Sequence, residues 1–219
     1  QMGQAAAELS EQRQAAAVRL AEDVEAHLRD LGLEAVRFQV VLERREDPGG
    51  IPLPDGQTCA FSPDGVDLVE FYVSANPGEP LRPLVRTAST GEMSRFMLAI
   101  KTVLAAADDI PVLVFDEIDI GVGGRSGEVI GRKLWDLSRH RQTICVTHLP
   151  QIAAFADAHY RVLKEVAGGR SVSRLETLDE AARIEELAAM LAGSAVTGAA
   201  RRHARELLES ARAWKEPGR

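Results

Sequence analysis

The chain has 219 residues, of which 45% are hydrophobic, enough for one globular domain, or one domain with an appendage, built around its own core. Its formal net charge of −7 argues against a strong, free-standing nucleic-acid binder, because such binding depends on Lys and Arg side chains that neutralise phosphates. The mean hydropathy is −0.11, and no apolar run approaches the roughly 20 residues that a membrane-spanning helix needs.

The two cysteines, Cys59 and Cys145, lie in apolar, strand-like stretches. We expect two buried, reduced thiols rather than a disulfide or a metal site, which favours a cytosolic protein. The first residues lack the basic and then apolar pattern of a secretory signal, and we expect them to mark a cut point rather than a natural beginning.

A proline-free segment rich in Ala, Glu, Arg and Leu predicts one helix over residues 4–31, which Gly32 ends. Small and apolar residues recur along it at spacings of four, three, four and three: Ala17, Ala21, Val24, Leu28 and Leu31. This spacing is typical of a coiled-coil seam, although only about two heptads fit. An ordinary amphipathic helix explains the pattern equally well.

The next section, to residue 80, predicts short strands and turns. Alternating residues predict a strand over 36–45, and the segment 47–56, rich in glycine and proline, predicts a loop. Residues 58–61 and 66–74 predict a β-hairpin closed by a turn at 62–65.

From residue 92, helices alternate with short apolar strands. The predicted elements are helix 92–107, strand 112–115, helix 126–138, strand 143–147, helix 151–156, a hairpin of 159–165 and 171–175 with its turn at Gly168-Gly169, and helices 179–191 and 197–213. The two apolar strands are typical of strands buried in a parallel sheet, joined by a right-handed crossover.

An acidic pair, Asp116 and Glu117, directly follows the apolar strand 112–115. Because α/β sheets bind ligands at the carboxyl ends of their strands, the pair is a candidate ligand-binding site. The segment resembles a Walker B strand, which implies that Asp116 would hold Mg²⁺ through water and that Glu117 would polarise the attacking water as a general base. A buried strand running into a solvated acidic turn gives the same pattern.

Two further motifs have chemical meaning. Ser89 and Glu92 have the spacing of a capping box, which predicts a helix start whose free N–H groups can bind an anion; a capped helix without a ligand has the same sequence. His148 follows the second apolar strand, one crossover after the acidic pair. A single histidine in such a place is more often structural.

In order and spacing, these motifs resemble the carboxy-terminal lobe of an ABC/SMC-type P-loop ATPase head. The stretch 88–95 resembles the signature motif, 112–117 the Walker B strand, 119–125 the D-loop and His148 the switch histidine. The glycines of the D-loop stretch are not a phosphate cradle, because no G-x-x-x-x-G-K-[ST] sequence, the Walker A motif, occurs in the chain. The stretches 69–71, 76–79, 115–125, 147–156 and 183–191 resemble the RecN family of bacterial DNA-repair proteins, and the resemblance covers roughly residues 30–210.

The resemblance implies an α/β fold: a parallel sheet with flanking helices, a β-rich entry section and an amino-terminal coiled-coil helix. It also implies three segments, a coiled-coil stub helix over 1–31, the head lobe over 32–213 and a tail over 214–219.

For function, the resemblance implies an ATPase of DNA double-strand-break repair, in which ATP and Mg²⁺ are held between two heads. ATP would drive dimerisation and DNA binding or tethering, and hydrolysis would reset the heads. Glu117 and His148 would be catalytic, Asp116 would bind Mg²⁺ through water, and Asp119 would pack against the partner's nucleotide. The signature residues would reach that nucleotide in trans: Ser89, Thr90, Gly91 and Glu92.

The implied partners are an amino-terminal lobe that carries Walker A, a second identical head, and DNA through the complete protein. We expect no membrane partner, a cytoplasmic, nucleoid-associated location, and an inactive isolated chain.

Two alternatives remain open. Thr90 stands where the family usually has glycine, and its Cβ obstructs close approach of the backbone to phosphate, which leaves room for a non-enzymatic scaffold that dimerises and tethers DNA. A nucleotide-binding subunit of an ABC transporter is disfavoured by the leading helix and the Glu-ending signature.

The basic residues of segment 201–212 form either a DNA-contacting face or, more simply, a solvated helix surface.

Overall fold

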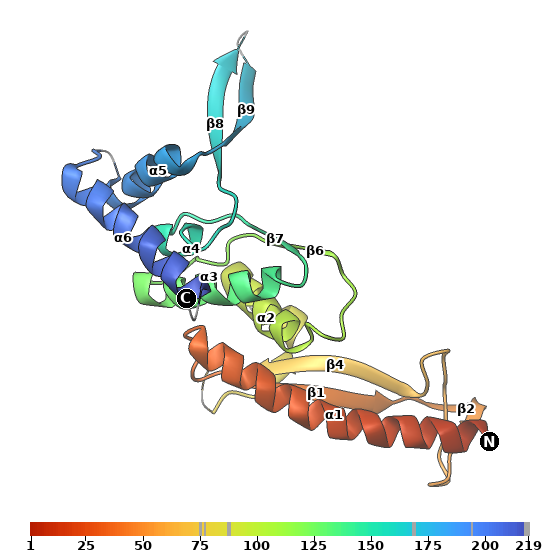
Figure 1. The fold of residues 1–219 in the computed structure, drawn as a ribbon. Helices are drawn as coiled ribbons and strands as arrows, with labels where there is room; N and C mark the ends of the chain where they lie inside the picture. The colour runs from red at the N-terminus through yellow and green to blue at the C-terminus, as the bar shows by residue number, and fades with distance from the viewer. Residues whose placement is uncertain (75, 77, 87–88, 168–169, 194, 217–219) are drawn as a thin grey trace. The chain divides into compact units, whose positions relative to one another are not determined.

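A computed structural model describes residues 1–74, 76, 78–86, 89–167, 170–193 and 195–216 (Figure 1). The chain divides into two compact units, unit 1 (Gln1–Ala106) and unit 2 (Ala107–Arg219). Each unit combines helices with strands, and unit 2 contains a parallel strand pair, which confirms the predicted α/β class.

Unit 1 is built on a long helix packed along an antiparallel sheet. Helix α1 (Met2–Asp30) contacts β1 (Arg37–Arg44), which pairs with β4 (Asp67–Ser74), and β4 pairs in turn with β5 (Arg82–Pro83). Most of the seam residues are buried in this core: Ala17, Val24, Leu28 and Leu31. Within the chain, the apolar stripe of α1 therefore serves the core of unit 1, as an amphipathic helix does.

The predicted loop at 47–56 is wrong in its first half, because β2 (Glu46–Pro52) pairs there with β3 (Thr58–Cys59). Glu46 and Ile51 both stand opposite Cys59, so the pairing register shifts between them. A Cβ on Gly50 would lie 1.9 Å from the Cys59 carbonyl oxygen, so the strands approach closely only because residue 50 is glycine.

The predicted hairpin of 58–61 and 66–74 is also wrong in its pairing. Strand β3 pairs with β2, whereas β4 pairs with β1 in a different sheet. Only the turn is present, where Ser62 and Gly65 exchange backbone hydrogen bonds of 2.9 and 3.1 Å. Gly65 has φ +106°, a conformation that glycine adopts readily.

Helix α2 (Thr90–Val103) closes unit 1, after a short 3-10 turn, η1 (Leu84–Arg86). It begins two residues before the predicted start at 92 and ends four residues before the predicted end at 107. Its buried face includes Phe96, Leu98 and Ile100, and it contacts α1. The helix therefore fixes the signature stretch at its amino-terminal end.

Unit 2 begins with the predicted strand–helix–strand crossover. Strands β6 (Val112–Phe115) and β7 (Gln142–Cys145) pair in parallel, and α3 (Gly124–Ser138) connects them. The expectation that both strands are buried on both faces is wrong for this chain. On β6, Leu113 and Phe115 are buried, whereas Val112 and Val114 are exposed.

The rest of unit 2 is a hairpin and a helical layer (Figure 1). Strands β8 (Tyr160–Ala167) and β9 (Arg170–Thr177) pair antiparallel; their predicted turn at Gly168-Gly169 lies outside the described residues. Helices α4 (Pro150–Ala153), α5 (Glu180–Ala192) and α6 (Gly198–Lys215) share a core that includes Phe155, Leu187 and Leu208.

The carboxy-terminal end of α6 is anchored by aromatic contacts. The Trp214 ring lies 5.5 Å from that of Trp135 and 5.7 Å from that of Phe155, centroid to centroid, both edge-on. Helix α6 thus extends two residues into the segment expected as a tail, and residues 217–219 lie outside the described part.

In the described part of the chain, every helix is too short or too polar to cross a bilayer.

Candidate functional site

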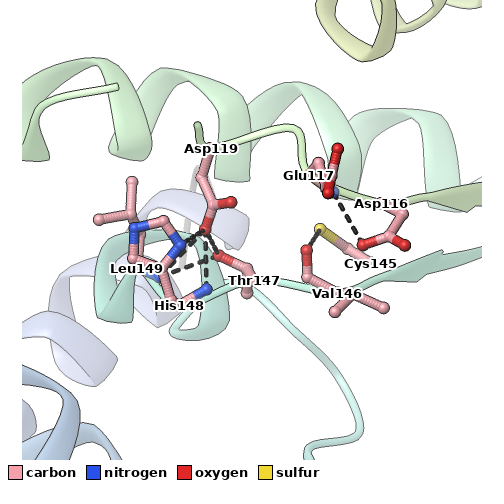
Figure 2. A network of polar contacts seen from close by, with 8 residues as sticks. All are labelled: Asp116, Glu117, Asp119, Cys145, Val146, Thr147, His148 and Leu149. Atoms are coloured by element: carbon pink, nitrogen blue, oxygen red, sulfur yellow. Dashed lines mark hydrogen bonds and ion pairs between the residues drawn. The ribbon is translucent and has the colours of Figure 1, made fainter. Parts of the chain in front are cut away.

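The candidate site of unit 2 lies where β6 and β7 end. In the parallel register Phe115 stands opposite Cys145. Beyond this pair, the Val146 N–H donates a hydrogen bond of 2.9 Å to the Phe115 carbonyl oxygen. The acidic pair therefore leaves one strand beside the loop that carries His148 on the next (Figure 2). The predicted crossover does bring these two loops to one edge of the sheet.

Asp116 and Glu117 form a tight acidic turn. The Glu117 N–H donates to Asp116 Oδ1 at 2.9 Å, and both residues are exposed. Glu117 has φ +57°, and among the described residues it is the one non-glycine residue with a positive φ. Such a conformation is costly for a residue with a Cβ and often occurs at functional sites. It sets the direction in which the Glu117 carboxyl leaves the strand.

Asp119 is the buried centre of the site, with 3% of its surface exposed. Its Oδ2 accepts hydrogen bonds from the backbone N–H groups of His148 (2.8 Å) and Leu149 (3.2 Å) and from the Thr147 hydroxyl. The same oxygen lies 3.0 Å from His148 Nδ1 (Figure 2). The His148 side chain itself is 70% exposed, so its other ring nitrogen is accessible.

Cys145 lies beside the acidic residues at the end of β7. Burial, together with the negative charges of Asp119 and Asp116, raises the pKa of its thiol to about 12. Both thiols are free, but Cys145 is only half-buried, so the prediction of two buried thiols holds for Cys59 alone. A neutral thiol at this place adds no negative charge to the acidic turn.

The signature stretch belongs to unit 1. The Glu92 carboxylate accepts hydrogen bonds from the Ser89 N–H at 3.1 Å and the Ser89 hydroxyl at 2.8 Å, and the capping box is present. Thr90 is exposed in the first turn of α2 and Gly91 is buried. Ala88, which begins the predicted motif, lies outside the described residues. The helix start is thus formed by local hydrogen bonds before any ligand is considered.

The residues of this site could supply only part of the coordination of a Mg²⁺ ion. Among the described residues, no three His, Cys, Asp or Glu side chains gather in a way that could hold a metal ion. Magnesium keeps several waters and is usually bound by one or two carboxylates together with substrate phosphates. The exposed Asp116 carboxylate suits this limited role.

A surface of four aliphatic side chains covers one face of the strand pair, here called the open face: Val112, Val114, Ile144 and Val146. All four are exposed, and Val114 is 66% exposed. In the parallel register Val114 stands opposite Ile144, so the surface is continuous across both strands. An apolar sheet face of this kind is normally covered in a folded α/β protein.

Comparison with known proteins shows which family shares this sequence. No family model matches the chain. The DNA repair protein RecN of Streptomyces coelicolor is 43% identical over 213 residues, covering 97% of this chain and 37% of the relative. RecN of Bacillus subtilis is 39% identical over 215 residues, with coverage of 97% and 37%. The chain belongs to the RecN family.

The chain spans 37% of the length of these RecN relatives, so it matches one part of each. RecN of Mycobacterium tuberculosis strain H37Rv, 44% identical over 218 residues, matches over the same 37% share. Among solved structures, the chain resembles the Smc head domain with a coiled coil and joint from Pyrococcus yayanosii. The TM-score is 0.54 at 20% identity, covering 80% of this chain and 29% of that one, which supports the fold alone.

Sequence reasoning missed two features of this RecN-family site. It did not foresee the left-handed backbone of Glu117, nor the position of Asp119 beneath the His148 loop. Neither feature left a signal in the sequence, because both depend on the folded backbone.

Proposed function

We propose that this chain is the carboxy-terminal lobe of a RecN ATPase head that hydrolyses ATP as part of DNA double-strand-break repair. One observation carries the proposal: an acidic pair and a histidine leave adjacent parallel strands at the same edge of the sheet. This arrangement suits the hydrolysis of a phosphoanhydride, because it offers a base and a phosphate-contacting group on one surface.

The roles follow from chemistry and exposure. Glu117 is exposed and would accept a proton from the attacking water, while Asp116, whose Oδ1 accepts the Glu117 N–H, would bind Mg²⁺ through water. A bound Mg²⁺ would neutralise charge on the phosphates. His148 presents an accessible imidazole and would contact the γ-phosphate and the water.

The site needs a second lobe. The chain contains no Walker A sequence, so the loop that would cradle the phosphates must come from elsewhere. The open face supports the same proposal, because four exposed aliphatic side chains on a parallel sheet suit further strands or helices of an amino-terminal lobe. The chain alone is therefore expected to be inactive.

A second head would complete each nucleotide site. The start of α2 presents a helix amino terminus, and Ser89, Thr90, Gly91 and Glu92 would meet the ATP of a partner head there. The D-loop stretch that begins at Asp119 would pack against the nucleotide site of that partner head. We propose a homodimer that binds DNA through the complete protein, in the cytoplasm at the nucleoid.

DNA contact by α6 itself is not part of the proposal. Arg201 pairs with Glu185 at 2.7 Å and Arg212 pairs with Glu180 at 3.0 Å, so two of its basic side chains serve the α5–α6 surface. This favours the solvated-surface interpretation of the helix.

One observation favours a second candidate, a non-enzymatic scaffold. Thr90 is exposed in the first turn of α2, where its Cβ would stand between the backbone and a phosphate. If the contact between this helix start and the partner's ATP were weakened in this way, the protein could still dimerise and tether DNA but would not hydrolyse ATP. The relationship to RecN gives no argument for the transporter subunit.

Glu117→Gln in the complete protein separates the two candidates. For the ATPase, hydrolysis falls by about 10²- to 10⁴-fold, as for loss of a general base, while ATP binding is retained. The matched control, Glu209→Gln, removes an exposed carboxylate of α6 outside the site and is expected to hydrolyse ATP normally. A complete protein that binds ATP but shows no turnover, with or without DNA, supports the scaffold.

A further inference from the structure

The Asp119 carboxylate, which lies beside the proposed nucleotide site, is bound by the loop that carries His148. One oxygen, Oδ2, accepts three hydrogen bonds from the loop that follows β7 and also lies 3.0 Å from His148 Nδ1. With 3% of Asp119 exposed, this oxygen faces the His148 loop rather than solvent (Figure 2).

These contacts fix the backbone of the His148 loop. The N–H groups of His148 and Leu149 follow the last paired residue of β7, where the strand ladder no longer supplies acceptors. A buried carboxylate without donors is costly, and backbone N–H groups without acceptors are too. Each requirement satisfies the other, and Thr147 strengthens the arrangement because its hydroxyl oxygen accepts the Leu149 N–H at 3.0 Å.

The contact with the imidazole has a definite chemical consequence. A neutral imidazole carries one N–H, and an ionised carboxylate can only accept a hydrogen bond. With Oδ2 at 3.0 Å from Nδ1, a proton on Nδ1 would face an acceptor, whereas a lone pair there would face another lone pair. The Nδ1–H tautomer is therefore favoured, and it leaves a lone pair on Nε2. The 70% exposed ring then offers Nε2 as an acceptor when neutral and as a donor when protonated.

We propose that Asp119 is a positioning residue that holds His148 in the Nδ1–H tautomer with Nε2 directed outward. Asp119 also follows Glu117 by two residues and flanks the buried Ile118. It therefore ties the loop of the proposed base to the loop of the histidine. Its importance for turnover rests on the proposed ATPase function, whereas the tautomer does not.

Nitrogen NMR of the imidazole tests the tautomer directly in the 219-residue chain. With ¹⁵N-histidine labelling at alkaline pH, the His148 signals, assigned by their loss in His148→Gln, should show a protonated Nδ1 and an unprotonated Nε2. Asp119→Ala should shift them towards the Nε2–H form. Asp119→Asn, which keeps an acceptor oxygen of the same size, should retain most of the Nδ1–H form.

The other four histidine signals control for folding, because none of those side chains contacts Asp119 through a described hydrogen bond. A wild-type chain with the proton on Nε2 would overturn the proposal without any variant. A tautomer unchanged by Asp119→Ala in a chain with intact control signals would also overturn it.

Kinetics of the complete protein test the consequence. Asp119→Ala should lower kcat by about 10- to 100-fold, the size of effect known for carboxylates that orient metal-bound histidines, with little change in KM. Added to His148→Ala, it should cause no further loss, because both changes remove one unit. Additive losses would show that Asp119 acts apart from His148. An inactive wild-type protein would contradict the ATPase proposal and leave the NMR result standing.

Discussion

Replacing Glu117 with glycine should give a more stable unit 2 than replacing it with alanine. Glu117 has φ +57°, and a left-handed conformation costs a residue with a Cβ about 1–2 kcal/mol, a cost that glycine does not have. The greater freedom of glycine in the unfolded chain offsets about 0.4–1 kcal/mol of this gain. At the middle of these two ranges, the net difference in the free energy of unfolding is about 0.8 kcal/mol in favour of Glu117→Gly. Both variants lose the same carboxyl, so its charge does not enter.

Asp116 provides the matched control, because its φ is not in the left-handed region. There glycine should be less stable than alanine by about 0.4–1 kcal/mol, so neighbouring positions should show opposite signs. Urea unfolding followed by tryptophan fluorescence measures unit 2 specifically, since the two tryptophans of the chain, Trp135 and Trp214, both lie in it. Equal or greater stability of Glu117→Ala would refute the inference that the backbone of the proposed base is strained.

Three further predictions concern packing, pH and thiol chemistry. Gly50→Ala should destabilise unit 1 by about 1–3 kcal/mol, because its Cβ would lie 1.9 Å from the Cys59 carbonyl oxygen. As a control, Gly49→Ala should have little effect, because the nearest atom to its Cβ is 3.4 Å away. Similar melting curves for the two variants by circular dichroism would contradict this. Burial lowers the pKa of His159 below its ordinary value of 6.5, so the unfolded chain binds protons more readily and unit 2 should lose stability as the pH falls below about 6.5. His159→Gln should flatten this dependence in urea titrations at pH 7.5 and 5.5, and an unchanged slope would count against it. With a pKa of about 12, Cys145 should react with iodoacetamide at pH 8 far more slowly in the folded chain than in urea; equal rates by peptide mass spectrometry would disprove the assignment.

The elements that the sequence predicted well are those with a local cause. Strand β6 (Val112–Phe115) is an unbroken apolar run before an acidic turn, and α2 begins at the capping box of Ser89 and Glu92. The pairings that were wrong depend on distant residues. Strand β4 finds β1 rather than the neighbouring β3, and β2 forms only because Gly50 can approach Cys59.

The candidate site divides in the same way. The crossover rule brings Asp116, Glu117 and His148 to one edge of the sheet, because parallel strands end together. The position of Asp119 beneath the His148 loop follows from tertiary packing, which no spacing in the sequence encodes. The open face could not be predicted for another reason. An all-apolar strand predicts burial on both faces, and only the folded chain shows which face is left exposed.

On the proposed function, this chain holds half of a nucleotide site. The direct test is Mg-ATP hydrolysis by the chain alone and within a longer polypeptide that supplies a Walker A lobe, each with and without Glu117→Gln. Turnover is expected only in the longer polypeptide, with a loss of about 10²- to 10⁴-fold in the variant. Hydrolysis by the chain alone that depends on Glu117 would rule out a half-site, because the chain would then contain a complete site without Walker A.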